Sequence, residues 1–484
     1  MTDTNKPIAK ANIALIYYVF LLLICIIYGV ICLLYQPLVY NSEFVIKSWG
    51  WLSIFLLLLS TFTFIKRTNS VFNAYIIYVL VAYFYWLGLL FLNALNINID
   101  RTVLSWFDYK ALIGPIVYTV LGFGLFQLAA LLYTQKNSFI TNFSQSEIFT
   151  NKRNKSAVLI TSVILLLISA PIYYSNLINN AIVSLTSGYG ALYNNANDSS
   201  SVNNIISSLE IFFIPGLYLF FSVNRKSKIA RYFVISLVVI NILLSFLTGV
   251  RSLALILLIS FLWLYHVQVS PFKGKKNLLL VILGIFIMAL SVTIIQYRGT
   301  SDKTFTEFLN IFFKNIGEEN FIITFISELG YSIYPLIETM RLIPENIDFA
   351  YGFSYLSSFL AVIPSLLLGG FSFANYAALD VWLMNQLNIN YGPGYSLIAE
   401  TYYNFGWFGL LLMPIWGGIL VRIFNNVIIS EGKVVRNAYI AILVYYLLMT
   451  ARSPLLLSVR NIFYGIIIPM VLIKLFELAG GRKR

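Results

Sequence analysis

Long apolar runs, separated by short charged or turn-rich breaks, dominate the 484-residue chain. A helix that crosses the hydrocarbon core of a bilayer needs about 20 apolar residues, and a window of that length separates such helices from ordinary buried ones. Twelve runs fit or nearly fit this length: 12–35, 49–65, 71–95, 111–133, 157–175, 205–223, 232–248, 252–269, 278–297, 401–424, 437–451 and 461–478. The pattern predicts an all-α polytopic membrane protein with about twelve transmembrane helices.

Basic residues gather in alternate breaks, beginning with Lys6 and Lys10 before the first run, and acidic residues gather mostly in the other breaks. Because lysine and arginine accumulate in the short cytoplasmic loops of membrane proteins, we expect both chain ends to face the cytoplasm. The net charge of +13 then follows from membrane topology. We therefore expect no nucleic-acid partner.

One break is far longer than the rest and is expected on the outer face. It divides a single membrane domain into spans one to nine (1–297), an outer loop (298–400) and spans ten to twelve (401–484). Within the loop, "FTEFLNIFFKNI" has the spacing of an amphipathic helix. "FIITFISELGYSIYPLIETMRLIP" predicts a helix broken by Pro335, and "YGFSYLSSFLAVIPSLLLGG" is compatible with a re-entrant segment. We expect the loop to form a lid or a cavity.

Arginines stand out on the expected outer side: Arg101, Arg251, Arg298, Arg341, Arg452 and Arg460. The positive-inside rule does not require cations there, and the guanidinium fork binds phosphate in two-pronged fashion while keeping its charge when desolvated. Five of them form a candidate pyrophosphate site, in the order Arg298, Arg251, Arg452, Arg460 and Arg341. The alternative is that each arginine reaches the membrane surface or pairs with an outer acid.

Glu400 is the strongest candidate for a catalytic carboxylate. Apolar residues flank it, and it follows the turn "YGPGYS". Burial raises the pKa of a carboxyl towards the range useful for a general base, although a structural hydrogen bond or an ion pair would explain the residue equally well. Asp380 and Glu328 are lesser candidates, and Glu338 is spaced to pair with Arg341 along one helix.

Aromatic residues make up 17% of the chain, and most are expected to face lipid or the membrane interface. Tyr395 and Tyr402, which lie beside the candidate carboxylate, could instead stack on sugar rings, as could Tyr391 and Tyr403. His266 is the only histidine and lies at the expected inner end of the eighth span. No motif for a metal, a nucleotide or a Ser/His/Asp triad is visible, and both cysteines lie inside the first span.

The segment "GPGYSLIAETYYNFGWFG", together with "FAYGFSYLSSFLAVIP", "TGVRS", "QYRG", about twelve spans and one large outer loop, resembles the Wzy-type polymerases of O-antigen and capsule assembly. The resemblance covers nearly the whole chain. It implies a fold like that of the membrane lipid-sugar (GT-C-like) glycosyltransferases and a location in the bacterial inner membrane. It also implies that neither a metal nor another cofactor is needed.

The implied reaction uses undecaprenyl-pyrophosphate-linked oligosaccharides within the membrane lipid. The growing glycan moves from its carrier to the incoming lipid-linked repeat unit, and undecaprenyl pyrophosphate leaves. The arginines would hold the pyrophosphate, Glu400 would accept the proton of the acceptor hydroxyl, and Tyr395 and Tyr402 would contact sugars. The resemblance further implies a polysaccharide co-polymerase, which regulates chain length, as a partner.

Two other functions stay open. The related O-antigen ligases are expected to use a histidine in the outer loop, and the only histidine here lies elsewhere. A flippase or transporter of lipid-linked oligosaccharides would also need about twelve spans and cations for pyrophosphate. Such a protein would place charges along a central pathway, whereas the interiors of spans seven to nine are nearly free of charge.

Overall fold

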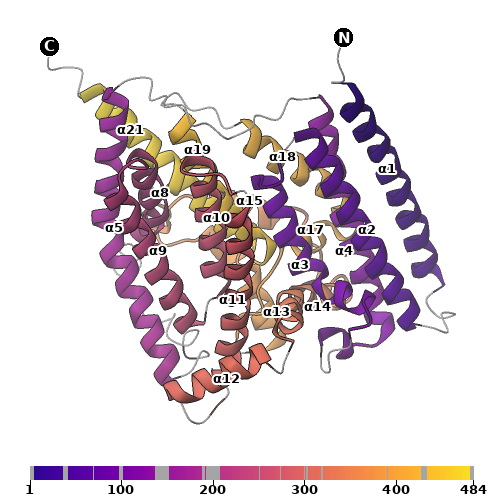
Figure 1. Cartoon of the computed structure of the whole chain (residues 1–484). Coiled ribbons are helices and arrows are strands. Elements are labelled where there is room, and N and C mark those ends of the chain that lie inside the picture. Colours follow the sequence, from indigo (N-terminus) through magenta and orange to yellow (C-terminus); the bar gives the residue numbers. More distant parts are fainter. Residues whose placement is uncertain are drawn as a thin grey trace.

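The computed structural model describes a bundle of helices (Figure 1). The described residues are 5–35, 42–68, 70–97, 102–136, 152–187, 191, 208–249, 251–272, 274–298, 300, 304–317, 320–389, 391–426 and 433–479. All regular secondary structure in these ranges is helical, which confirms the predicted fold class.

The first half of the bundle consists of long helices. They are α1 (Asn5–Leu34), α2 (Ser42–Thr68), α3 (Ala74–Ala94), α4 (Tyr109–Lys136), α5 (Lys152–Ser187), α8 (Phe213–Val223), α9 (Lys228–Thr248), α10 (Arg251–Gln268) and α11 (Lys275–Arg298). Their ends follow ordinary capping chemistry. Asn73 and Ser227 cap α3 and α9 by accepting backbone hydrogen bonds, and Gly249 ends α9 in the left-handed conformation with φ of 92°.

Shorter helices follow. They are α12 (Phe305–Gly317), α13 (Phe321–Gly330), α14 (Tyr334–Leu342), α15 (Phe353–Leu360), α16 (Leu379–Leu387) and α17 (Leu397–Phe405). The chain returns through α18 (Leu412–Asn426), α19 (Lys433–Leu448), α20 (Leu455–Ile462) and α21 (Ile468–Ala479). The start of α1 and the end of α21 lie at one end of the bundle, at the top of Figure 1, and α12 lies across the other end.

Eleven helical segments in the described part are long and apolar enough to cross a membrane. All but Phe321–Leu342 coincide with predicted spans. The two remaining predicted spans, 205–223 and 278–297, appear as the shorter apolar helices Leu209–Val223 and Leu278–Ile294. Phe321–Leu342 was expected as a broken helix of the outer loop. It is interrupted between α13 and α14, and Pro335 lies in the first turn of α14, where a missing N–H costs nothing.

Two groups of helices meet at α19. The helices α8, α9 and α21 pack on α5, whereas α1, α2 and α18 pack on α4. Between the groups, α19 contacts α3, α8 and α10, and 94% of the apolar window Val434–Ala451 is buried. The close approach of α18 to α4 depends on a glycine, because a side chain at Gly417 of α18 would collide with the backbone carbonyl of Phe126 on α4. The bundle therefore has a buried centre on which a site can be held rigidly.

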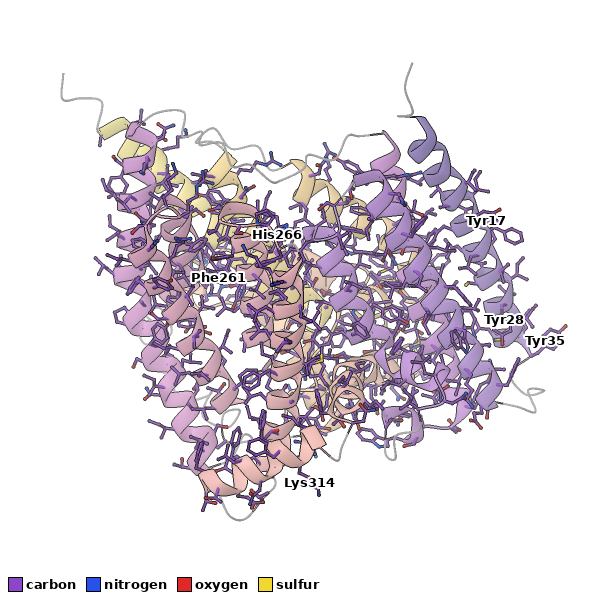
Figure 2. All side chains as sticks on the ribbon, viewed as in Figure 1. Tyr17, Tyr28, Tyr35, Phe261, His266 and Lys314 are labelled. Atoms are coloured by element: carbon purple, nitrogen blue, oxygen red, sulfur yellow. The ribbon has the colours of Figure 1, made fainter. Side chains whose placement is uncertain are left out.

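The amphipathic helix predicted from "FTEFLNIFFKNI" is confirmed as α12. Phe308 and Phe312 turn towards α11, whereas Phe305 and Phe313 are exposed. Figure 2 shows Lys314 of α12 at the end of the bundle opposite to His266, which lies near the last turn of α10. The imidazole of His266 accepts a hydrogen bond from the Phe272 N–H through Nδ1 (3.0 Å). His266 is thus remote from the segment predicted to form the outer lid.

Candidate functional site

A cavity of about 600 Å³ lies where the ends of α9, α10, α13 and α19 meet the segment before α17. Two of the five candidate phosphate-binding arginines, Arg251 and Arg452, line it. The other charged residues in its wall are Glu328 and Asp380. Residues from four distant parts of the sequence are therefore brought together around one space.

Arg251 begins α10, directly across the tight connection from the end of α9. Its Nη2 atom forms a salt bridge with Glu328 Oε2 at 3.1 Å. Its Nη1 atom lies 3.4 Å from the carbonyl oxygen of Ser291 on α11. The two charged side chains are 20% and 34% exposed, so the pair faces the cavity without being sealed in protein. Glu328 balances the charge of Arg251 when no ligand is bound.

Arg452 lies in the turn between α19 and α20, and its side chain is exposed to the cavity. The backbone of this turn is fixed on both sides. The carbonyl of Ala451 accepts a hydrogen bond from the Trp86 indole N–H (2.9 Å), and the carbonyl of Arg452 accepts one from the Tyr395 N–H (2.9 Å). The Tyr85 side chain lines the same cavity. Arg452 is thus a cation on a rigid support. Among the described residues, no acidic side chain forms an ion pair with it.

The turn "YGPGYS" supplies another wall of the cavity and contacts Arg452 directly. Gly394 has a φ of 74°, and a Cβ atom there would lie 3.2 Å from the Arg452 carbonyl oxygen and 3.5 Å from its Cγ. Only glycine adopts this conformation at little cost while the backbone approaches so closely. The Gly-Pro-Gly sequence therefore allows the chain to lie against Arg452.

Glu400 is fully buried in α17, and both carboxylate oxygens accept hydrogen bonds from protein groups. The Ser354 hydroxyl donates to Oε1 at 2.9 Å, and the N–H of Leu455 donates to Oε2 at 2.8 Å. Leu455 is the first residue of α20, so Glu400 satisfies one of the backbone donors that every helix start leaves free. Asn404 extends the network by donating to the Ser354 hydroxyl oxygen at 2.7 Å.

This network places Glu400 behind the cavity wall, since Glu400 is not among the residues that line the cavity. It joins α15, α17 and α20, and it holds Leu455, which lies three residues after Arg452. A general base must reach the proton of a substrate hydroxyl, directly or through one water. The role of Glu400 as a base stays a prediction, and the contacts of its carboxylate favour a positioning role.

Asp380 does line the cavity, from the first turn of α16. Burial raises the pKa of its carboxyl above the ordinary value, and hydrogen bonds from the backbone of Asp380 and Val381 partly offset this rise. A carboxyl with a raised pKa can exchange a proton nearer neutral pH. The apolar setting of "AALDVWLMN" was the signal that identified this residue in the sequence.

Arg341 and Arg460 are not among the cavity-lining residues. Arg341 pairs with Glu338 at 3.1 Å, as their spacing predicted, and its guanidinium lies 5.8 Å from the centre of the Phe107 ring. Arg460 lies in α20, and its buried Nε atom has no hydrogen-bond partner among the described residues. Neither residue joins the group around Arg251 and Arg452.

Two further predicted cations lie outside what the structure describes. Arg298 is the last residue of α11, but its side chain is outside the described part. Arg101 lies outside the described residues altogether.

The two tyrosines predicted to contact sugars are buried beside the cavity. The Tyr395 hydroxyl is hydrogen-bonded to the Thr339 hydroxyl at 2.8 Å, and the Tyr402 hydroxyl lies 3.4 Å from the carbonyl oxygen of Ile343. Neither lines the cavity.

Other aromatic side chains form the cavity wall instead: Tyr85, Trp106, Tyr331, Tyr334 and Tyr391. The ring of Trp106 packs edge-on against Tyr331 at 5.8 Å and Tyr334 at 6.0 Å. Except for Tyr391, this set was missed, because a chain so rich in aromatics gives no local signal for the few that meet in space. Among the described residues, no group of three or more His, Cys, Asp or Glu could hold a metal ion.

The cavity thus combines two guanidinium groups, an aromatic wall, and the carboxyls of Glu328, which is paired with Arg251, and Asp380. Such a site suits a ligand that carries both an anionic group and sugar rings. In comparisons with known proteins, a model of the family described as O-antigen polysaccharide polymerase Wzy matches residues 13–480. Neither a curated protein nor a solved structure matches the chain, so the GT-C-like fold stays a prediction.

Proposed function

Because the chain belongs to the O-antigen polysaccharide polymerase Wzy family, we propose that it polymerises lipid-linked oligosaccharide repeat units in the cavity lined by Arg251 and Arg452. The proposed donor is the growing glycan on undecaprenyl pyrophosphate, and the proposed acceptor is a hydroxyl of the incoming lipid-linked repeat. The observation that carries the proposal is the rigid presentation of the Arg452 guanidinium to an aromatic-walled cavity.

In the proposed reaction, the bond between the anomeric carbon of the donor and the pyrophosphate oxygen breaks. A new bond forms between that carbon and the acceptor oxygen, and the electron pair leaves with the pyrophosphate. Arg452 and Arg251 would stabilise the negative charge that develops on the leaving group. Removal of one such preorganised donor typically lowers the rate by about 10²–10³-fold. Rigid support matters because a preorganised cation needs no rearrangement during the reaction.

The acceptor hydroxyl must lose its proton during the transfer, and the cavity offers Asp380 for this step. Glu328 is engaged with Arg251, and both oxygens of Glu400 are occupied within the protein. We assign the proton to the Asp380 carboxylate and a positioning role to Glu400. The aromatic wall around Trp106 would stack on the sugar rings and hold the acceptor in line with the donor.

The membrane orientation proposed here follows the charge pattern. The start of α1 and the end of α21 would face the cytoplasm, and the end of the bundle that carries α12 would face outward from the bacterial inner membrane. The cavity would then open towards the face where the glycan grows. A polysaccharide co-polymerase would be a partner that regulates the length of the product.

The experiment that tests this function is polymerisation by the purified protein with its lipid-pyrophosphate repeat unit, without nucleotide sugar and with a chelator present. The proposal predicts a ladder of products that differ by one repeat unit. If intact substrate yields no ladder but crosses the bilayer of proteoliposomes, the protein is a flippase. If the glycan passes instead to an added lipid A–core acceptor without lengthening, the protein is a ligase.

A further inference from the structure

A second cavity, of about 320 Å³, lies between α5, α9, α11 and α12. Its lining is hydrocarbon and aromatic except for Ser184 and the hydroxyl of Tyr297. Leu185 and Leu247 in this wall are 43% and 45% exposed, whereas Phe246 and Ile294 are buried. The cavity therefore has a buried floor and an open rim on the apolar flank of the bundle, where α5, α9 and α11 run beside one another (Figure 1).

The second cavity lies next to the cavity of Arg251, and both are lined by residues of α11 and of the end of α9. Leu290 of α11 lines the apolar cavity, and the adjacent Ser291 lines the polar one. At the end of α9, Phe246 lines the apolar cavity, and Gly249, one turn later, lines the polar one. Phe246 and Ile294 belong to one buried apolar cluster and form the floor of the apolar cavity on this side. A ligand with an anionic head and a long apolar tail fits the two cavities together.

The helix α12 closes the apolar cavity at the end of the bundle. Phe308 of α12 lines the cavity, and its ring packs edge-on against Tyr297 at 5.5 Å. Asn315, which is fully buried, fastens the same helix to α11 by donating a hydrogen bond to the Thr293 hydroxyl at 3.0 Å. Because α12 is attached at this point, a chain entering from the flank is held beneath it.

We propose that the apolar cavity between α5, α9, α11 and α12 binds the part of the polyprenyl chain nearest the pyrophosphate while Arg251 and Arg452 hold the head. This inference rests on the proposed function, because the lipid-linked substrate supplies the ligand. At about 30 Å³ for each water-sized group, the cavity holds roughly ten carbon-sized groups, or about two prenyl units. The rest of the chain extends past the exposed leucines into the bilayer.

The test measures binding of a fluorescent long-chain polyprenyl pyrophosphate to the whole protein in nanodiscs. Leu290→Trp fills the cavity, and Leu279→Trp, an exposed position on the same helix that does not line it, is the matched control. Loss of one well-fitted apolar group typically weakens binding by about 10-fold or more. We expect this loss for Leu290→Trp only. Inorganic pyrophosphate has no polyprenyl chain, so its own inhibition constant, corrected for the affinity of the probe, should be equal in the wild type and the two variants.

Three results would overturn the inference. Equal affinity of Leu290→Trp and Leu279→Trp for the polyprenyl probe would remove the cavity from the binding site. Displacement of the probe by phosphatidylglycerol at equal mole fraction would make the cavity a general site for acyl chains. If Leu290→Trp fails to fold, Leu247→Trp at the open rim takes its place, and wild-type affinity there would also overturn the inference. These binding results are independent of polymerisation, so failure of the proposed function is detected separately by the absence of a product ladder.

Discussion

Replacement of Glu400 by glutamine separates two roles for this residue. Glutamine keeps one oxygen that can accept the hydrogen bond from the Leu455 N–H, but it cannot accept a proton from a substrate. If Glu400 positions the turn of Arg452, the substitution chiefly weakens the helix-start contact with the Leu455 N–H, because the glutamine amide can donate a hydrogen bond to the Ser354 hydroxyl oxygen. Loss of a capping interaction costs about 0.5–2 kcal/mol. At 1.4 kcal/mol for each tenfold change, the rate then falls by at most about 30-fold.

A general base contributes more, typically about 10²–10⁴-fold. The assay is the initial rate of polymerisation by Glu400→Gln, with Glu400→Ala beside it and thermal unfolding measured for both. We expect Glu400→Ala to unfold at a lower temperature than Glu400→Gln, because alanine leaves both the Leu455 N–H and the Ser354 hydroxyl without this partner. A folded Glu400→Gln protein that loses more than about 10²-fold in rate would refute the positioning role and restore Glu400 as the base.

Three other substitutions test the cavity. Gly394→Ala forces a side chain into a left-handed conformation that costs about 1–3 kcal/mol, so it should lower both the unfolding temperature and the polymerisation rate. In the control Gly284→Ala, the added Cβ meets nothing within 4 Å, so the rate should be unchanged and the stability unchanged or slightly higher. Equal effects of the two substitutions would show that the Gly394 contact is unimportant. Glu328→Gln releases Arg251 from a partly exposed ion pair worth up to about 1 kcal/mol. Inorganic pyrophosphate should therefore inhibit polymerisation by the variant at about two- to fivefold lower concentration. Unchanged inhibition would argue against anion binding at Arg251. Asp380 must be deprotonated to act as a base, so the wild-type rate should rise with pH through the raised pKa of this carboxyl. Asp380→Asn should lose most of the rate, and its remaining rate should no longer rise with pH in this range. A pH profile unchanged by the substitution would exclude Asp380 as the base.

The sequence predicted the long helices and several members of the site because those features are local. Apolar runs identify spans, and the segments "TGVRS", "RSP" and "GPGY" each contain a charge or turn that a membrane protein does not need for topology. The structure brings all three segments to one cavity. The ion pair of Arg341 and Glu338 was also predictable, since its spacing along a helix is fixed.

The environment of Glu400 could not be predicted in the same way. Its apolar neighbours in the sequence indicate burial, and burial is confirmed. Its partners are Ser354 and Leu455, which lie 46 and 55 residues away, so no local pattern indicates that both oxygens are occupied. For the same reason, nearness in sequence predicts Tyr395 and Tyr402, whereas Trp106 and Tyr331 reach the cavity from segments far from Glu400 in the sequence.

The most direct test of the account compares two arginines in the polymerisation assay. Arg452→Gln removes the cation that faces the cavity, and Arg341→Gln removes one that is paired with Glu338 outside it. The account predicts that the product ladder is lost or reduced by about 10²-fold or more in Arg452→Gln and persists in Arg341→Gln, with both proteins folded. A full ladder from Arg452→Gln, or equal loss in the two variants, would contradict the assignment of this cavity as the site of polymerisation.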